Sequence, residues 1–296
     1  MQYGRTIGTP APSRRLRTRR RPRRRRRLVR GLLRLMVLAV GAAGVFAAVF
    51  LVGRAADALF GPKTMLRLPV FLQDEDSLAA RAQALGHTLE EYSDTLQALY
   101  EKEPAARDFV AAYPDKKGQV ADTIDISDAL AEGGIPLFMQ WDDRWGYGEY
   151  GSDVMGLTGC GPTCLSMVAA GLTGDASLTP WAVAQFSVNN GYCVPGSGTA
   201  WALMDEGAAA LGLQAESLPL SRDKVFAALE AGQPIICIMG PGDFTTQGHF
   251  IVLTGVKDGL LQVNDPNSTE NSAQTWDYDA IESQIRGMWT YRRAAA

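Results

Sequence analysis

Helical and strand patterns are segregated in the C-terminal part of this 296-residue chain. Apolar residues at helical spacing come first and predict helices over residues 162–170, 179–190, 200–211 and 221–230. Runs rich in β-branched residues follow and predict strands over residues 234–239, 249–256, 260–264 and 288–292. Helices followed by strands indicate an α+β domain, with helices packed on an antiparallel sheet. We place this domain at residues 135–296.

Charge is divided unequally along the chain. Residues 1–34 hold 14 of the 29 Lys and Arg residues and no acidic residue, whereas the remaining 262 residues hold 15 basic and 32 acidic ones. An arginine run can bind nucleic acid. Beside an apolar segment, contact with anionic lipid head groups is the simpler interpretation. We therefore expect lipid contacts by this arm and no nucleic-acid partner.

An apolar segment follows the arginines. From Leu35 to Val52 every residue is apolar or glycine, and about 20 apolar residues in a helix cross a bilayer core. Residues 35–53 are thus predicted to form one transmembrane helix. Because the arginines precede it, residues 1–34 are predicted to be cytoplasmic and the C-terminal domain extracellular, in a single-pass protein of the cell membrane. The alternative is a cleaved signal peptide, whose apolar region is typically shorter, about 7–15 residues.

The stretch between the span and the C-terminal domain has helical character. Thr88-Leu89-Glu90-Glu91 matches a capping box, and apolar residues recur at helical spacing from Leu89 to Tyr113. Residues 54–118 are therefore predicted to be a helical stalk or cap. Residues 119–134 are acidic and poor in aromatic residues, which is typical of a linker.

Gly159-Cys160-Gly161-Pro162-Thr163 places a thiol at the start of the first predicted helix. Proline suits the first turn of a helix, and the N–H groups and dipole at that end favour a thiolate. Cys160 is therefore a candidate nucleophile. The alternative interpretation is a small buried cysteine at a tight turn.

The other cysteines give no metal signature. The chain has four cysteines, Cys160, Cys164, Cys193 and Cys237. Their spacing matches neither a CxxC pair nor a zinc ligand set, and only His87 and His249 are available as further ligands, so we expect no metal and no other cofactor. A disulfide among Cys164, Cys193 and Cys237 is compatible with an extracellular location, provided that Cys160 stays free to act as a nucleophile.

A predicted hairpin brings His249 close to Asp265. Lys257-Asp258-Gly259 is interpreted as a three-residue loop, which pairs Val256 with Leu260. Counting back along the strands places Asp265 as the diagonal neighbour of His249 on one face, within reach of the imidazole ring. A two-residue loop would move Asp265 to the opposite face.

His249 and Asp265 admit alternatives. Asn267 lies opposite His249 in the same register and is the alternative partner that could orient the ring. A core histidine at the start of a strand is the non-catalytic interpretation of His249. In a domain that also presents Cys160, however, a thiol, an imidazole base and an orienting group make up a nucleophilic triad.

These residues resemble the C39-like branch of papain-fold cysteine peptidases, which is related to the peptidases that remove double-glycine leader peptides. The resemblance rests on Gly159-Cys160-Gly161-Pro162-Thr163, Gly248-His249-Phe250-Ile251-Val252 and Val263-Asn264-Asp265-Pro266, in this order. It covers about residues 135 to 293.

The resemblance implies a papain-like cysteine peptidase fold and assigns a role to each site residue. Cys160 looks like the nucleophile, His249 like the general base and acid, and Asp265 like the orienting acid. Such enzymes use a glutamine upstream of the cysteine to stabilise the oxyanion, and Gln140 is the matching candidate. Twenty positions separate Gln140 from Cys160, whereas the gap in the leader peptidases is much shorter.

The resemblance therefore implies a membrane-anchored extracytoplasmic cysteine peptidase that hydrolyses peptide or protein substrates through an acyl-enzyme. No transporter-type spans or nucleotide-binding motif accompany the site residues, so cleavage after a double glycine is not implied. One alternative is an amidase or endopeptidase acting on peptidoglycan stem peptides. An alternative of another class is a non-catalytic binding or scaffold protein that retains the fold, which the intact triad positions argue against.

Overall fold

The computed structural model describes residues 76–194, 196 and 198–295. The predicted arginine arm, the predicted transmembrane helix and the first part of the predicted stalk lie outside these residues. Within the described ranges, no helix combines the length and the hydropathy needed to cross a membrane. The described residues form one compact unit.

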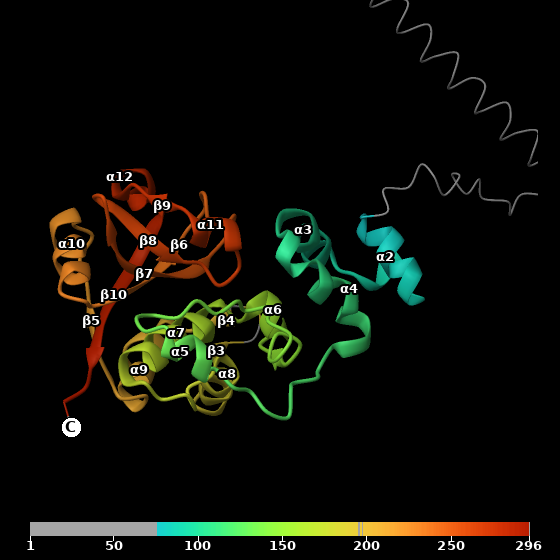
Figure 1. The fold of residues 1–296 in the computed structure, drawn as a ribbon, viewed down its shortest axis with the longest axis horizontal. Coiled ribbons are helices and arrows are strands. Elements are labelled where there is room, and N and C mark those ends of the chain that lie inside the picture. The colour runs from blue at the N-terminus through green and yellow to red at the C-terminus, as the bar shows by residue number, and fades with distance from the viewer. Residues whose placement is uncertain (1–75, 195, 197, 296) are drawn as a thin grey trace, which may run out of the picture. The chain divides into compact units, whose positions relative to one another are not determined.

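A six-stranded antiparallel sheet dominates the C-terminal part of this unit (Figure 1). Its strand order is β5-β10-β6-β7-β8-β9. The strands are β5 (Leu213–Ser217), β6 (Ile235–Met239), β7 (His249–Lys257), β8 (Leu260–Asn264), β9 (Thr275–Trp276) and β10 (Ile285–Arg293). Two short hairpins precede the sheet, formed by β1 (Glu149–Tyr150) with β2 (Asp153–Val154) and by β3 (Cys193–Val194) with β4 (Gly198–Thr199). The predicted α+β class with an antiparallel sheet is confirmed.

Helices cover both faces of the sheet. The helices on the first face are α7 (Cys160–Thr173), α8 (Pro180–Asn189) and α9 (Glu206–Ala210), and those on the second are α10 (Arg222–Glu230) and α12 (Tyr278–Ile281). Side chains of β6 alternate between the two hydrophobic clusters: Ile236 and Ile238 join the first, and Ile235, Cys237 and Met239 join the second. Burial on both faces accounts for the uninterrupted apolar run of this strand.

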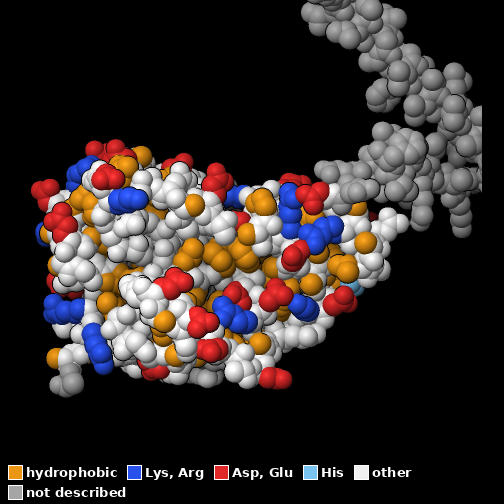
Figure 2. Space-filling model, viewed as in Figure 1, with side chains coloured by type: hydrophobic (Ala, Val, Ile, Leu, Met, Phe, Trp, Pro, Cys, Tyr) orange, Lys and Arg blue, Asp and Glu red, His pale blue; other side chains and the backbone are white. Residues whose placement is uncertain are grey.

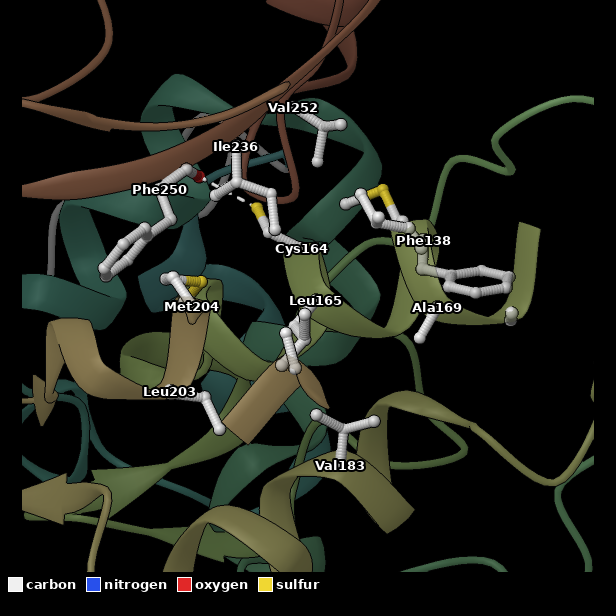
Figure 3. Close-up of a cluster of buried hydrophobic side chains, with 14 of the residues drawn as sticks. Phe138, Cys164, Leu165, Ala169, Val183, Leu203, Met204, Ile236, Phe250 and Val252 are labelled. Atoms are coloured by element: carbon white, nitrogen blue, oxygen red, sulfur yellow. Dashed lines mark hydrogen bonds between the residues drawn. The ribbon is translucent and has the colours of Figure 1, made fainter. Parts of the chain in front are cut away.

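The first cluster anchors α7 against the sheet. Figure 3 shows Cys164 of this helix beside Ile236 and Phe250 of the strands, whereas Leu165 points toward Leu203 and Val183 in the same cluster. On one face of the molecule, hydrophobic side chains gather in a band between the sheet and the helical layer (Figure 2). The N-terminal end of α7, where Cys160 lies, is thus held by a packed core.

The N-terminal helices form a third cluster together with the start of the C-terminal domain. These helices are α2 (Leu78–Leu85), η2 (Leu89–Glu91), α3 (Asp94–Lys102), η3 (Pro104–Ala106) and α4 (Arg107–Lys116). They pack against Trp141, Tyr147 and Val154, and Phe109 stacks on Tyr147 with ring centroids 4.4 Å apart. The stretch predicted as a linker also carries α5 (Ser127–Ala131) and buries Ile126 in the core around α7.

Phe109→Ala is expected to lower the free energy of unfolding by about 3–5 kcal/mol, because it removes a large, fully packed ring and leaves a cavity. Phe109 is 2% exposed and also contacts Gly156. Leu89→Ala, at a side chain 38% exposed, is the matched control and is expected to change the free energy by about 0.5 kcal/mol or less. Urea unfolding measures both variants, and equal effects would contradict the packing described.

The β7–β8 hairpin corrects the predicted loop. Lys257 pairs with Leu260, so the loop has two residues, Asp258 with φ 53° and Gly259 with φ 78°. Positive φ at both positions is the two-residue hairpin geometry that Asp-Gly favours. The register then shifts between Leu253 and Gly255, where β7 contains a bulge.

The bulge restores the predicted register farther from the loop. Val252 pairs with Asn264, as it would with a three-residue loop and no bulge. The loop is one residue shorter than predicted and the bulge adds one residue to β7, so the two differences offset each other in the strand register. Asp265 therefore follows β8 on the side expected from the sequence, next to His249.

Two further elements differ from prediction. The helix predicted over residues 200–211 is divided into η4 (Trp201–Met204) and α9, because the Asp205 side chain accepts a hydrogen bond from the Glu206 N–H and starts a new helix. Strand β5 was not predicted. It lies at the sheet edge and buries only Leu213 fully, so its sequence lacks an apolar run.

Candidate active site

Cys160 is the first residue of α7, in the position predicted from its flanking glycines. The Thr163 hydroxyl donates to the Gly159 carbonyl at 2.7 Å and fixes the first turn. Gly161 allows a close approach to β4, because a Cβ there would lie 2.6 Å from Thr199 Oγ1. The first N–H groups of a helix have no acceptor within it, so the start of α7 can donate to an anion beside the thiol.

His249 and Asp265 form a buried pair. His249 Nε2 lies 2.7 Å from Asp265 Oδ1, and the two residues are 6% and 1% exposed. The Asn267 N–H also donates to Oδ1 at 2.9 Å, and Asn271 Nδ2 donates to Oδ2 at 2.8 Å. Of the two predicted partners for the imidazole, Asp265 makes the contact. Asn267 supports it through its backbone.

Cys160 and His249 line the same cleft. The imidazole is close enough to the thiol for each group to shift the pKa of the other. Because Asp265 occupies Nε2, Nδ1 is the nitrogen left for the sulfur. The structure therefore brings Cys160, His249 and Asp265 together as a connected set.

The charges of these three groups stabilise one another. Burial by itself raises the pKa of the Cys160 thiol, but the hydrogen bond and charge of His249, with the N–H groups of Phe250 and Gly161, outweigh it and lower that pKa. Burial by itself lowers the pKa of His249, but the Asp265 carboxylate and Cys160 raise it. Burial raises the pKa of Asp265, and His249, Asn271 and the Asn267 N–H lower it. These shifts favour a thiolate and an imidazolium beside a carboxylate.

Alkylation of Cys160 by iodoacetamide is expected to rise with pH at a midpoint below the ordinary thiol pKa of about 8.5, because the thiolate is the nucleophile. Mass spectrometry of the modified peptide at each pH measures the rate at this one cysteine. Cys193, which is half-buried and free, is the internal reference within the same chain. A Cys160 midpoint at or above 8.5 would show that His249 does not stabilise the thiolate.

A cleft of about 520 Å³ opens onto Cys160 and His249. Four glycines are among its lining residues. It is also lined by Arg286 and by Trp201, which is 50% exposed. The complete lining is Ser152, Leu157, Thr158, Cys160, Gly196, Gly198, Thr199, Trp201, Ile238, Met239, Gly240, Pro241, Gln247, Gly248, His249, Phe250 and Arg286. The abundance of glycine leaves backbone groups accessible to an extended peptide.

Gln140 is not in this cleft. Its Nε2 donates to the Gly156 carbonyl at 2.8 Å, and its Oε1 accepts no hydrogen bond from the described residues. It lines a separate cavity of about 170 Å³ with Leu157 and Asn267. The predicted oxyanion role of Gln140 therefore has no support in this geometry. Its backbone N–H instead donates to the Pro266 carbonyl at 2.7 Å and holds the loop that follows Asp265.

The four cysteines are free thiols in the structure. Cys164 is buried and donates to the Phe250 carbonyl at 3.2 Å (Figure 3). Burial raises the pKa values of Cys164 and Cys237 well above the ordinary range. These two buried thiols therefore remain protonated at neutral pH, whereas the pKa of Cys160 is shifted in the opposite direction.

Asn271 was not identified from the sequence. It follows Asp265 by six positions and reaches it from α11 (Thr269–Ala273). Ser268 caps this short helix by accepting the Asn271 N–H at 3.2 Å. The Ser-Thr-Glu pattern could have predicted the helix, but nothing in it indicates which side chain faces Asp265.

A thiol at a helix start, bonded to an imidazole that a carboxylate orients, is the arrangement that thiol hydrolases use. A model of the Peptidase_C39 like family matches residues 133–296, which is more than half of the chain. The chain belongs to the Peptidase_C39 like family. The resemblance drawn from the three sequence motifs is thereby confirmed.

Solved structures of similar fold include three peptidases. The peptidase domain of Streptococcus ComA, a bifunctional ABC transporter of a quorum-sensing pathway, is 20% identical, with 47% of this chain and 93% of that chain covered and a TM-score of 0.37. A putative C39-like peptidase from Bacillus anthracis is 16% identical, with coverage of 58% and 98% and a TM-score of 0.35.

The third is a double-glycine-motif protease of an AMS/PCAT transporter in complex with its leader peptide, at 20% identity, with coverage of 55% and 95% and a TM-score of 0.36. Among curated proteins, no relative matches the sequence.

Proposed function

We propose that the chain is a cysteine peptidase in which Cys160 is the nucleophile, His249 the general base and acid, and Asp265 the group that orients His249. The observation that carries this proposal is the buried 2.7 Å contact between His249 Nε2 and Asp265 Oδ1, which leaves Nδ1 of the imidazole available to Cys160. The accessible cleft at the same thiol supplies room for a substrate.

The reaction follows from these positions. The Cys160 thiolate attacks the carbonyl carbon of a peptide bond, and the oxyanion that forms is stabilised by N–H groups at the start of α7. Protonated His249 donates its proton to the nitrogen of the leaving amine, which departs and leaves a thioester on Cys160. His249 then takes a proton from water, the hydroxide attacks the thioester, and the thiolate and the product acid are released.

Peptide or protein segments are the proposed substrates, and the proposed location is the outer side of the cell membrane. The location is supported by the apolar residues 35–53 that follow the arginine-rich arm. A membrane-impermeant maleimide applied to intact cells should label Cys160. Labelling only after the membrane is permeabilised would contradict the location.

The proposed peptidase activity is tested in cells by comparing extracellular peptides from the wild type and Cys160→Ala. Peptides that require Cys160 are expected, and Cys193→Ala is the control for loss of an unrelated free thiol. An unchanged peptide profile would count against proteolysis. A change confined to cell-wall fragments would favour the stem-peptide alternative.

A further inference from the structure

A buried carboxylate of the N-terminal helices contacts the part of the chain that carries Asp265. Glu103 follows α3 and is 3% exposed. Its Oε2 accepts the backbone N–H of Thr269 at 2.8 Å, and its Oε1 accepts the Thr269 hydroxyl at 2.7 Å. Thr269 is the first residue of α11, so Glu103 fixes the start of that short helix.

The helix that Glu103 contacts is also the one that holds the orienting acid. Asn271 donates to Asp265 Oδ2 at 2.8 Å, and the Ser272 hydroxyl accepts the backbone N–H of Asp265 at 2.9 Å. A shift of α11 would therefore move both the side-chain and the backbone partners of Asp265. Only Glu270 lies between Thr269 and Asn271 in the sequence, so the path from Glu103 to Asp265 is short.

Side-chain packing between α3 and the loop that follows Asp265 is incomplete. A cavity of about 170 Å³ lies between α3 and the loop after Asp265, lined by Leu99, Glu103, Gln140 and Asn267 among others. A cavity supplies no van der Waals contacts, so the polar contact at its edge has more influence on the position of α11. Glu103 also accepts the Ala105 N–H at 3.3 Å. A buried carboxylate that lost Thr269 would be left with an unfavourable charge.

Glu103 lies outside the part of the chain that the family model matches, which begins at residue 133. The N-terminal helices thus add a contact to a site whose other residues all lie within the family domain. The same helices also contact the segment that leads to Cys160, because Phe109 packs against Gly156, four residues before Cys160.

We propose that Glu103 is a positioning residue for the active site: through Thr269 and α11 it holds Asp265 in the orientation that contacts His249. The inference rests on the proposed function, in which Asp265 orients His249. It makes the N-terminal helices part of the active-site scaffold.

The test measures the pH dependence of Cys160 alkylation in the full chain. Glu103→Ala is expected to move the midpoint about one unit to higher pH, which reduces the rate about tenfold at pH values below the wild-type midpoint. Glu103→Gln retains an oxygen that can accept the Thr269 N–H and is expected to recover part of the rate. Thr269→Val keeps that N–H and loses only the hydroxyl, so a smaller shift is expected. Glu101→Gln, at an exposed position of α3, is the matched control and is expected to behave as the wild type.

The outcomes separate a positioning role from a structural one. Urea unfolding identifies the variants that fold, and if Glu103→Ala does not fold, Glu103→Gln and Thr269→Val carry the test. Folded variants with the wild-type midpoint overturn the inference even if they are less stable. A wild type whose Cys160 titrates as an ordinary thiol overturns the proposed function itself, and the inference with it.

Discussion

His249→Ala is expected to slow the alkylation of Cys160 at pH 7 about a hundredfold, because the thiolate fraction falls about tenfold for each unit by which the thiol pKa exceeds the pH. In the wild type, the hydrogen bond and charge of His249 oppose the effect of burial on the Cys160 pKa. Without the imidazole, burial prevails and the thiol stays protonated. Iodoacetamide modification of the Cys160 peptide, followed by mass spectrometry, measures the rate.

His87→Ala is the control for this result. His87 contacts Glu91 and Asp115 in the N-terminal helices and takes no part in the cleft. Its removal is expected to leave the rate unchanged. If the two histidine variants alkylate equally fast, Cys160 is not activated by His249.

Asp265→Asn is expected to raise the pKa of the Cys160 thiol by about one to two units, which lowers the alkylation rate about tenfold to a hundredfold at pH values below the wild-type midpoint. The asparagine has nearly the same shape but carries no charge. Burial then lowers the pKa of His249 without the opposing effect of the carboxylate, so the imidazole is neutral at pH 7 and no longer stabilises the thiolate. The full pH profile should show the Cys160 midpoint displaced toward that of an ordinary thiol.

Asp258→Asn is the matched control for this substitution. Asp258 has φ 53° in the β7–β8 turn, a conformation that asparagine also adopts readily. The same chemical change there should leave the alkylation profile unaltered. An Asp265→Asn profile that coincides with the wild type would show that the carboxylate does not orient or charge His249.

The α+β class could be predicted because helical and strand periodicities are local properties of the sequence. Strand β6 buries side chains on both faces, and its apolar run was correctly interpreted. Strand β5, at the sheet edge, buries only Leu213 fully and escaped prediction. The sequence pattern therefore predicts a strand correctly where every side chain is buried, as in β6, and fails where only one side chain enters the core, as in β5.

The proximity of His249 and Asp265 was predicted for a reason that is only partly correct. A two-residue loop by itself would have placed Asp265 on the opposite face, and the bulge between Leu253 and Gly255 reverses that effect. Bulges depend on how the strand fits its neighbours, so the sequence of β7 alone does not reveal this one.

Gln140 and Glu103 illustrate what requires the folded structure. Gln140 was assigned from the resemblance, but its amide donates to Gly156 and not toward the cleft. Glu103 contacts Thr269 across 166 positions of sequence, a separation at which single-sequence patterns hold no pairing information. The Glu103 contact depends on the way the N-terminal helices pack beside the family domain.

The claim that Cys160 is the nucleophile of a peptidase is tested by cleavage of a diverse peptide library by the purified full chain. Mass spectrometry of the new peptide termini identifies each cleaved bond. Wild-type protein is expected to generate new termini that Cys160→Ala does not. Equal cleavage by both proteins, or no cleavage by a wild type whose Cys160 is rapidly alkylated, would contradict the claim.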